Sequence, residues 1–229
     1  MIHPSALQWN AIRPSGATGT LRCVPKSKKS VISMVFKESV TPEEIETMEL
    51  IAFDGPISVV TERGKDFDEA IRHLAGSRII GFDTETKPIF NNKAHRNGTA
   101  LLQLSSETHA FLFRLQQLGL PQELADILAS GSITKVGAAV ADDIRGLQRY
   151  TDFEAERFMD LQWFAEKYGI KDKSVKKLTA IILGRKVSKA QQLSNWEATE
   201  LSRAQQLYAA TDAWICLKMY KTLLGSYGS

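Results

Sequence analysis

Two acidic side chains stand one residue apart directly after an apolar stretch. Residues 78–82 (RIIGF) are typical of a buried strand, and Asp83 and Glu85 follow it. Alternate residues of a strand face the same side, so the two carboxylates project together and raise each other's pKa unless a cation lies between them. Mg²⁺ and Mn²⁺ prefer such oxygen ligands. The pair predicts a metal site, and a polar turn after the strand is the alternative.

Two later segments carry acids with the same potential. Tyr208 and Asp212 stand four residues apart in an alanine-rich, helix-like run, so they share one helical face. The alanines would let another element approach this helix closely, and an amphipathic helix with an exposed aspartate is the alternative. Residues 135–141 indicate an apolar strand and a turn that deliver Asp142 and Asp143 at a helix start. There Asp142 could instead serve only as a helix cap.

Hydrophobic periodicity predicts the elements that must position these acids. Strands are predicted at 57–60, 78–82, 101–104, 110–113 and 134–138. Helices are predicted at 66–75, 122–129 and 142–150, and most of the chain after residue 160 is predicted to be helical. A short acidic helix should begin at Pro42, with Thr41 as its cap. This order predicts an α/β fold with a mixed five- or six-stranded sheet flanked by helices.

Length and composition exclude several classes of protein. The 229 residues are 43% hydrophobic and 24% charged, which suffices for a buried core and excludes a disordered chain. No run approaches the roughly 18 apolar residues of a membrane-spanning helix. Two cysteines cannot form a disulfide framework or a four-cysteine zinc site and are typical of a reducing compartment, which predicts a cytoplasmic location. Sequence motifs of NTPases, dinucleotide enzymes, serine hydrolases and zincins are absent.

The net charge of +3 is unevenly distributed. Residues 1–33 contain five basic side chains and no acidic one, so the rest of the chain carries 24 basic and 26 acidic residues. The overall charge therefore does not indicate an acidic partner; only a local basic patch could. Residues 1–33 lack periodicity and are predicted to be a disordered tail, with the folded part opening at Met34. An organellar transit peptide is the alternative for this tail.

The three acidic motifs, in this order, resemble the 3′–5′ exonuclease family of the DnaQ-like, ribonuclease H-like fold. They are most similar to its tyrosine-containing branch, which includes ribonuclease D and the Werner exonuclease domain. The run 193–197 (LSNWE) is also similar to that branch. The resemblance implies a ribonuclease H-like fold with a helical C-terminal part. It also implies an exonuclease domain at 57–225, preceded by an N-terminal extension at 34–56.

The resemblance implies four acidic metal ligands. Three of them are the acids of the first and last motifs: Asp83, Glu85 and Asp212. In the family the fourth lies eight residues after a lysine that begins the preceding strand. Counting from Lys135 gives Asp143 and leaves Asp142 as a cap or neighbour. The sister branch carries a histidine at the position that Leu207 occupies here, so the resemblance assigns Tyr208 to orient the attacking water.

The implied reaction is hydrolysis of single-stranded DNA or RNA from the 3′ end to nucleoside 5′-monophosphates, with two divalent ions, Mg²⁺ or Mn²⁺. No membrane is implied. Substrate contacts are expected from four further residues: Thr84, Lys93, Arg96 and Lys189. Solvated surface positions are the alternative for the basic ones, and Trp196 is expected to pack rather than stack on a base. The rival functions are a catalytically silent nucleic-acid-binding domain of the same fold and another two-metal phosphoesterase.

Overall fold

The computed structural model describes residues 36–88 and 98–225, which all belong to one compact unit, Ile32–Ser229. The described residues do not include the predicted tail at 1–33, nor Lys93 and Arg96. The predicted domain bounds stay predictions. Among the described helices, none is long and apolar enough to cross a membrane.

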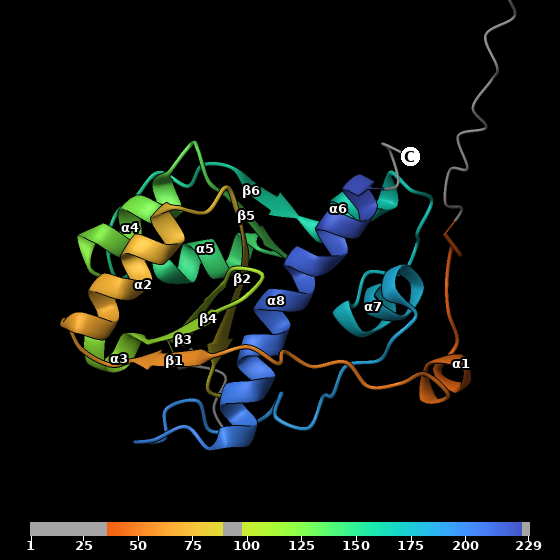
Figure 1. The fold of residues 1–229 in the computed structure, drawn as a ribbon, viewed down its shortest axis with the longest axis horizontal. Coiled ribbons are helices and arrows are strands. Elements are labelled where there is room, and N and C mark those ends of the chain that lie inside the picture. Colours follow the sequence, from red (N-terminus) through yellow and green to blue (C-terminus); the bar gives the residue numbers. More distant parts are fainter. Residues whose placement is uncertain (1–35, 89–97, 226–229) are drawn as a thin grey trace, which may run out of the picture. The chain divides into compact units, whose positions relative to one another are not determined.

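A six-stranded mixed sheet forms the centre of the fold (Figure 1). Its strands are β1 (Ile57–Val60), β2 (Ile79–Thr86), β3 (Thr99–Ser105), β4 (Ala110–Arg114), β5 (Thr134–Gly137) and β6 (Phe158–Asp160), in the order β1-β4-β3-β2-β5-β6. Strand β3 runs antiparallel to β2 and β4, whereas the other neighbouring pairs are parallel. The mixed α/β prediction is therefore confirmed. Strand β6 was not predicted, because three residues are too few to show a period.

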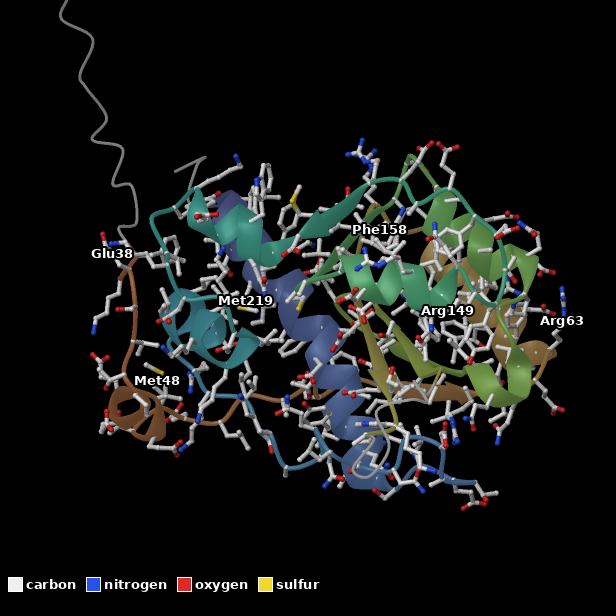
Figure 2. The ribbon with its side chains drawn as sticks, turned by 180° about the vertical axis from the view of Figure 1, so that it is seen from behind. Glu38, Met48, Arg63, Arg149, Phe158 and Met219 are labelled. Atoms are coloured by element: carbon white, nitrogen blue, oxygen red, sulfur yellow. The ribbon has the colours of Figure 1, made fainter. Side chains whose placement is uncertain are left out.

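Helices cover both faces of this sheet. They are α1 (Pro42–Glu46), α2 (Lys65–Ala75), α3 (Leu115–Leu118), α4 (Gln122–Ala129), α5 (Ala141–Leu147), α6 (Leu161–Glu166), α7 (Val175–Leu183) and α8 (Arg203–Gly225). One core joins the sheet to α2 and α4, and a second joins it to α6, α7 and α8. In the second core Met219 of α8 lies buried against α7, where Thr179 Oγ1 donates to its Sδ (Figure 2).

Strand β2 continues beyond the predicted end at Phe82, and this corrects the sequence prediction. It runs on to Thr86 because β3 keeps pairing with it, Asp83 opposite Gln103 and Glu85 opposite Leu101. Its other neighbour, β5, pairs with it only as far as Gly81. The two acids therefore lie inside a strand, just beyond the point where the sheet loses β5.

A glycine brings helix α8 close to this strand. A Cβ added at Gly81 would lie 1.9 Å from the backbone oxygen of Ala213, and Ala213 is itself fully buried. Only a residue without a side chain allows such an approach. The alanines of α8 allow the close approach that the sequence predicted. The helix that carries Asp212 therefore packs directly on the strand that carries Asp83.

Replacing Gly81 by alanine is therefore expected to push α8 away from β2. We expect a loss of about 1–3 kcal/mol of folding free energy, as for other overpacked cores, and a lower melting temperature. Gly76→Ala is the matched control, because a Cβ there would make only ordinary contacts at 3.6 Å. Thermal melts of both variants test this close packing, and equal melting temperatures would contradict it.

The described part of the N-terminal extension is held along its length by α7, the loop after it and α8. Thr41 caps α1 and forms a capping box with Glu44, as predicted for a helix beginning at Pro42. Leu50 pairs with Lys186 in an isolated parallel bridge. Further along, the Phe53 backbone N–H donates to Thr211 Oγ1 of α8 at 3.0 Å.

Candidate active site

Three carboxylates converge between β2 and α8. One oxygen each of Asp83, Glu85 and Asp212 lies within 4.8 Å of the others, and all three side chains are partly enclosed. Asp83 and Glu85 are alternate residues of β2 and face the same side. Asp212 meets them because α8 packs directly on that strand. Two elements far apart in the sequence therefore build one acidic cluster.

Burial and mutual repulsion disfavour the charged form of these acids. Burial, followed by the charges of Asp212 and Asp143, raises the pKa of Asp83 well above its usual range. Burial, followed by the charges of Asp83, Asp212 and Asp143, raises the pKa of Glu85 to about 9. Burial also raises the pKa of Asp212 to about 7, although a hydrogen bond from Tyr208 and the charge of Lys189 oppose this rise. A cluster of buried carboxylate oxygens fits a hard divalent cation, which would relieve this repulsion.

Asp143 lies beside the cluster, in the first turn of α5, but outside the group of three. Thr84 Oγ1 donates to its Oδ1 at 2.5 Å, and burial raises its pKa to about 6. Thr84 thus holds Asp143, and its expected contact with substrate stays a prediction. Asp142 is different, because 89% of its side chain is exposed and it pairs with Arg145. Asp142 is not the N-cap of α5 either, because the helix already begins at Ala141. Val140 holds the N-cap position, and its side chain makes no capping hydrogen bond.

Tyr208 lies one turn before Asp212 on α8, and the interaction of its hydroxyl with that carboxylate lowers the pKa of Asp212. Burial and the neighbouring acids raise the pKa of Tyr208. Trp196 packs beside it with ring centroids 6.0 Å apart and is fully buried, which confirms its expected packing role. The phenol therefore stays protonated and is held at the edge of the acidic cluster.

Comparison with known proteins identifies the family to which this chain belongs. The sequence model of a family described as 3′–5′ exonuclease matches residues 59–226. This chain belongs to the 3′–5′ exonuclease family. The match begins and ends close to the region in which the motifs resemble that family, so the expected family is confirmed.

Individual relatives and solved structures support the same family. The bifunctional 3′–5′ exonuclease/ATP-dependent helicase WRN of Mus musculus is 34% identical over 66% of this chain and 11% of its own length. The exonuclease 3′–5′ domain-containing protein 2 of Drosophila melanogaster is 32% identical over 68% of this chain and 27% of its own. This chain thus spans only a small part of the length of these relatives.

Two solved exonucleases share the fold. The Aedes aegypti Nibbler EXO domain superposes with a TM-score of 0.66 and 22% identity, over 75% of this chain and 88% of that one. Escherichia coli RNase D gives a TM-score of 0.66 and 20% identity, over 78% and 46%. The expected ribonuclease H-like fold is thereby confirmed.

Lys189 is the basic residue whose charge reaches the acids of the site. It lines the same hollow as Asp83, Glu85 and Asp212, and it lowers the pKa of Asp212. Its basic neighbours in sequence are paired with acids, two of them with Glu46 of the N-terminal extension. The pairs are Lys176 and Lys186 with Glu46, Arg185 with Glu49, and Lys177 with Asp172. Lys176 lines the same hollow but pairs with Glu46, so Lys189 is the favoured candidate of this run for phosphate contact.

Gln103 is a residue that sequence reasoning missed. It is the direct neighbour of Asp83 on β3 and is fully buried. Neither its amide nitrogen nor its oxygen has a hydrogen-bond partner in the described part of the chain. Buried side-chain amides normally have hydrogen-bond partners, so a buried amide without one, on the residue opposite Asp83, is unusual. A single glutamine inside the apolar strand 101–104 was the signal that could have revealed it.

Proposed function

We propose that this protein removes nucleotides from the 3′ end of single-stranded DNA or RNA as nucleoside 5′-monophosphates. The observation that carries the proposal is the partly buried cluster of Asp83, Glu85 and Asp212 with the Tyr208 hydroxyl beside it. Membership of the 3′–5′ exonuclease family supports the reaction. A nucleic-acid substrate is supported by a solved relative with a TM-score of 0.66 and 22% identity, Trypanosoma brucei RNase D, which is in complex with RNA U12.

The acidic residues would hold two divalent ions, Mg²⁺ or Mn²⁺. We assign Asp83, Glu85 and Asp212 as direct ligands, and Asp143 as the fourth acid, oriented by Thr84. Bound divalent ions stabilise the charge that develops on the phosphate and lower the pKa of water. The chain supplies the carboxylate charge that retains them and a partly buried setting in which electrostatic interactions are strong.

Tyr208 would orient the attacking water. Its hydroxyl lies against Asp212, and its raised pKa keeps it protonated, so it can donate or accept a hydrogen bond but is a poor base. Lys189, which lines the same hollow as these acids, would add positive charge near the phosphate.

Digestion of single-stranded DNA and RNA oligonucleotides labelled at the 5′ end tests the proposal. With Mg²⁺ or Mn²⁺ the label should pass through a ladder of fragments shortened from the 3′ end, and the released products should be 5′-monophosphates. A chelator, or the variant Asp212→Asn, should abolish the ladder. A protein that binds the oligonucleotide but leaves it intact with either metal would be the catalytically silent domain instead.

A further inference from the structure

Gln103 of β3 lies beside the acidic cluster, on the same face of the sheet. In the antiparallel register of β2 and β3 it stands directly opposite Asp83, while Leu101 stands opposite Glu85. The Cβ atoms of directly opposite residues lie about 4.5–5.5 Å apart, and their side chains share one face of the sheet. Asp83 is therefore an immediate side-chain neighbour of Gln103.

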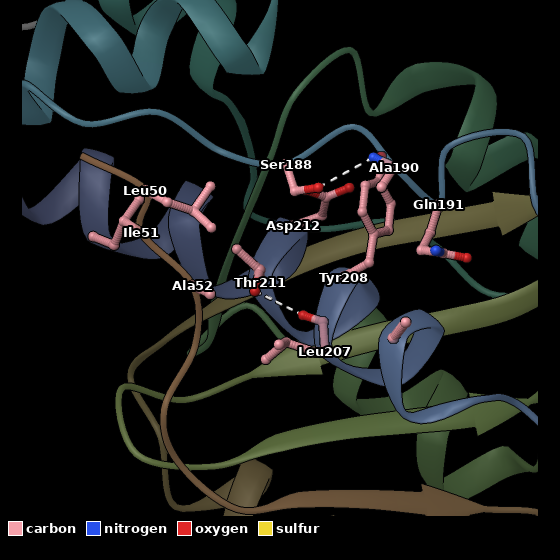
Figure 3. Close-up of a pocket in the computed structure, with 11 residues that line it drawn as sticks. Leu50, Ile51, Ala52, Ser188, Ala190, Gln191, Leu207, Tyr208, Thr211 and Asp212 are labelled. Atoms are coloured by element: carbon pink, nitrogen blue, oxygen red, sulfur yellow. Dashed lines mark hydrogen bonds between the residues drawn. The ribbon is translucent and has the colours of Figure 1, made fainter. Parts of the chain in front are cut away.

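Helix α8 covers this face of the two strands. Its Ala213 lies against Gly81 of β2, and its Ala209, one turn earlier, belongs to the same buried cluster as Leu101 of β3. In the strand register Gln103 falls between these two positions, and none of its surface is exposed. The same stretch of α8 carries the tyrosine and the aspartate of the acidic site (Figure 3). The Gln103 amide is thus enclosed between the sheet and α8.

This enclosed amide is not explained by the packing of the fold. Neither its Nε2 nor its Oε1 hydrogen-bonds another described residue. The next side chain on this face of β3, Ser105, already donates its hydroxyl to the backbone oxygen of Ser106 at 2.6 Å. An apolar side chain of the same size at position 103 would fill this layer without the cost of a buried, unpaired amide. The amide therefore points to a partner outside the hydrogen bonds of the sheet.

The Asp83 carboxylate can accept a further hydrogen bond. Its Oδ1 accepts the Thr84 backbone N–H at 2.9 Å. A carboxylate has about four acceptor sites on its two oxygens, so this bond leaves capacity for a metal ion and for another donor. Carboxylates that hold a metal ion are themselves normally held by hydrogen bonds from neighbouring groups. The Gln103 amide carries two N–H donors, and its residue stands directly opposite Asp83.

We propose that Gln103 is a positioning residue for Asp83. When the acidic cluster binds a divalent ion, an amide N–H of Gln103 donates to the Asp83 carboxylate and fixes its orientation. Gln103 acts on the ion through Asp83 and makes no contact with nucleic acid, because it is fully buried. This inference rests on the proposed function, in which Asp83 is a metal ligand, and deepens it.

Titration of the full chain with Mn²⁺, without nucleic acid, tests the inference. Gln103→Met keeps the length of the side chain and removes both donors, and Gln103→Leu removes them with a branched side chain. Leu101→Met is the matched control, because it alters packing in the same strand and on the same face without changing a polar group. Calorimetry gives the Kd for Mn²⁺, and thermal melts in a chelator show that each variant is folded.

The parent and Leu101→Met should bind Mn²⁺ with equal affinity. Both Gln103 variants should bind it about 10–100-fold more weakly, the usual loss when a group that orients a metal ligand is removed. In the chelator both should melt at or above the temperature of Leu101→Met, because they bury no unpaired amide. Gln103 variants that bind Mn²⁺ as tightly as the control would overturn the inference. Variants that both melt below the control would overturn it too, because the amide would then serve the fold.

Turnover separates this inference from the proposed function. At saturating Mn²⁺, Gln103→Met should lower kcat for a single strand about tenfold or more and leave KM unchanged, because the amide does not contact the strand. If the parent cleaves and both Gln103 variants match it in Kd and kcat, the inference fails and the proposed function stands. If the parent binds Mn²⁺ but cleaves nothing, the proposed function fails, and the comparison of Kd values still decides the inference. A parent that binds no Mn²⁺ would overturn both the metal ligands and the inference.

Discussion

Replacing Asp143 by asparagine is expected to lower nuclease turnover by about three orders of magnitude or more. The change removes one negative charge from the group that would retain the ions but keeps the shape that Thr84 contacts. A metal site contributes several kcal/mol to the transition state, and each 1.4 kcal/mol is about tenfold in rate. Steady-state release of mononucleotides from a single strand measures the effect.

The neighbouring aspartate provides the control. Asp142→Asn changes an exposed side chain that pairs with Arg145 on the surface, so activity should stay within about a few-fold of the parent. Tyr208→Phe should fall between the two, because it loses one hydrogen bond and no charge. An inactive Asp142→Asn beside a fully active Asp143→Asn would show that the fourth ligand is assigned to the wrong residue.

Without divalent ions the protein is expected to lose stability as the pH rises from about 5 to 8. The pKa of Glu85 is about 9 and that of Asp212 about 7 when folded, whereas unfolded carboxyls titrate near 4. The folded protein therefore holds protons that the unfolded chain releases. Each such group lowers the free energy of unfolding further as the pH rises, until the pH passes its folded pKa. The window ends at pH 8 because burial lowers the pKa of Lys135 to about 8, and that group acts in the opposite direction above it.

Thermal melts across this window measure the loss, which we expect to be on the order of 2–4 kcal/mol from Glu85. Glu85→Gln removes one of these carboxyls and should melt with a smaller dependence on pH, the rest of which comes from Asp83, Asp143 and Asp212. At pH 8, Mn²⁺ at about a hundred times its Kd should raise the parent's melting temperature by about 5–10 °C. If the melting temperature of the parent changes with neither pH nor Mn²⁺, these acids do not form a cation site.

Much of the fold follows from local patterns in the sequence. Strand β1 and helix α4 have the bounds that periodicity predicts, because each is a short element with clear turn signals at its ends. The extent of β2 could not be predicted in this way. Polar residues usually end a buried strand, and only the pairing with β3 carries this one on to Thr86.

The acidic site was predictable as a set of residues but not as an arrangement. Spacing alone places Asp83 with Glu85, and Tyr208 with Asp212, because each pair lies within one element. That Thr84 binds Asp143 depends on how α5 meets β2, which is a tertiary contact. The pairing of Lys176 and Lys186 with Glu46 is long-range too, so these lysines looked free in the sequence.

The arrangement of α8 on β2 also dictates when the site can exist during folding. The acids come from β2, α5 and α8, and α8 is the last helix of the described chain. Contacts between segments so distant in sequence cost loop-closure entropy and are slow to form. A chain that ends before α8 lacks Asp212 and Tyr208, however well its sheet has formed. The proposed nuclease chemistry would thus be confined to the completed domain, and a partly synthesised chain could not degrade nucleic acid by this site.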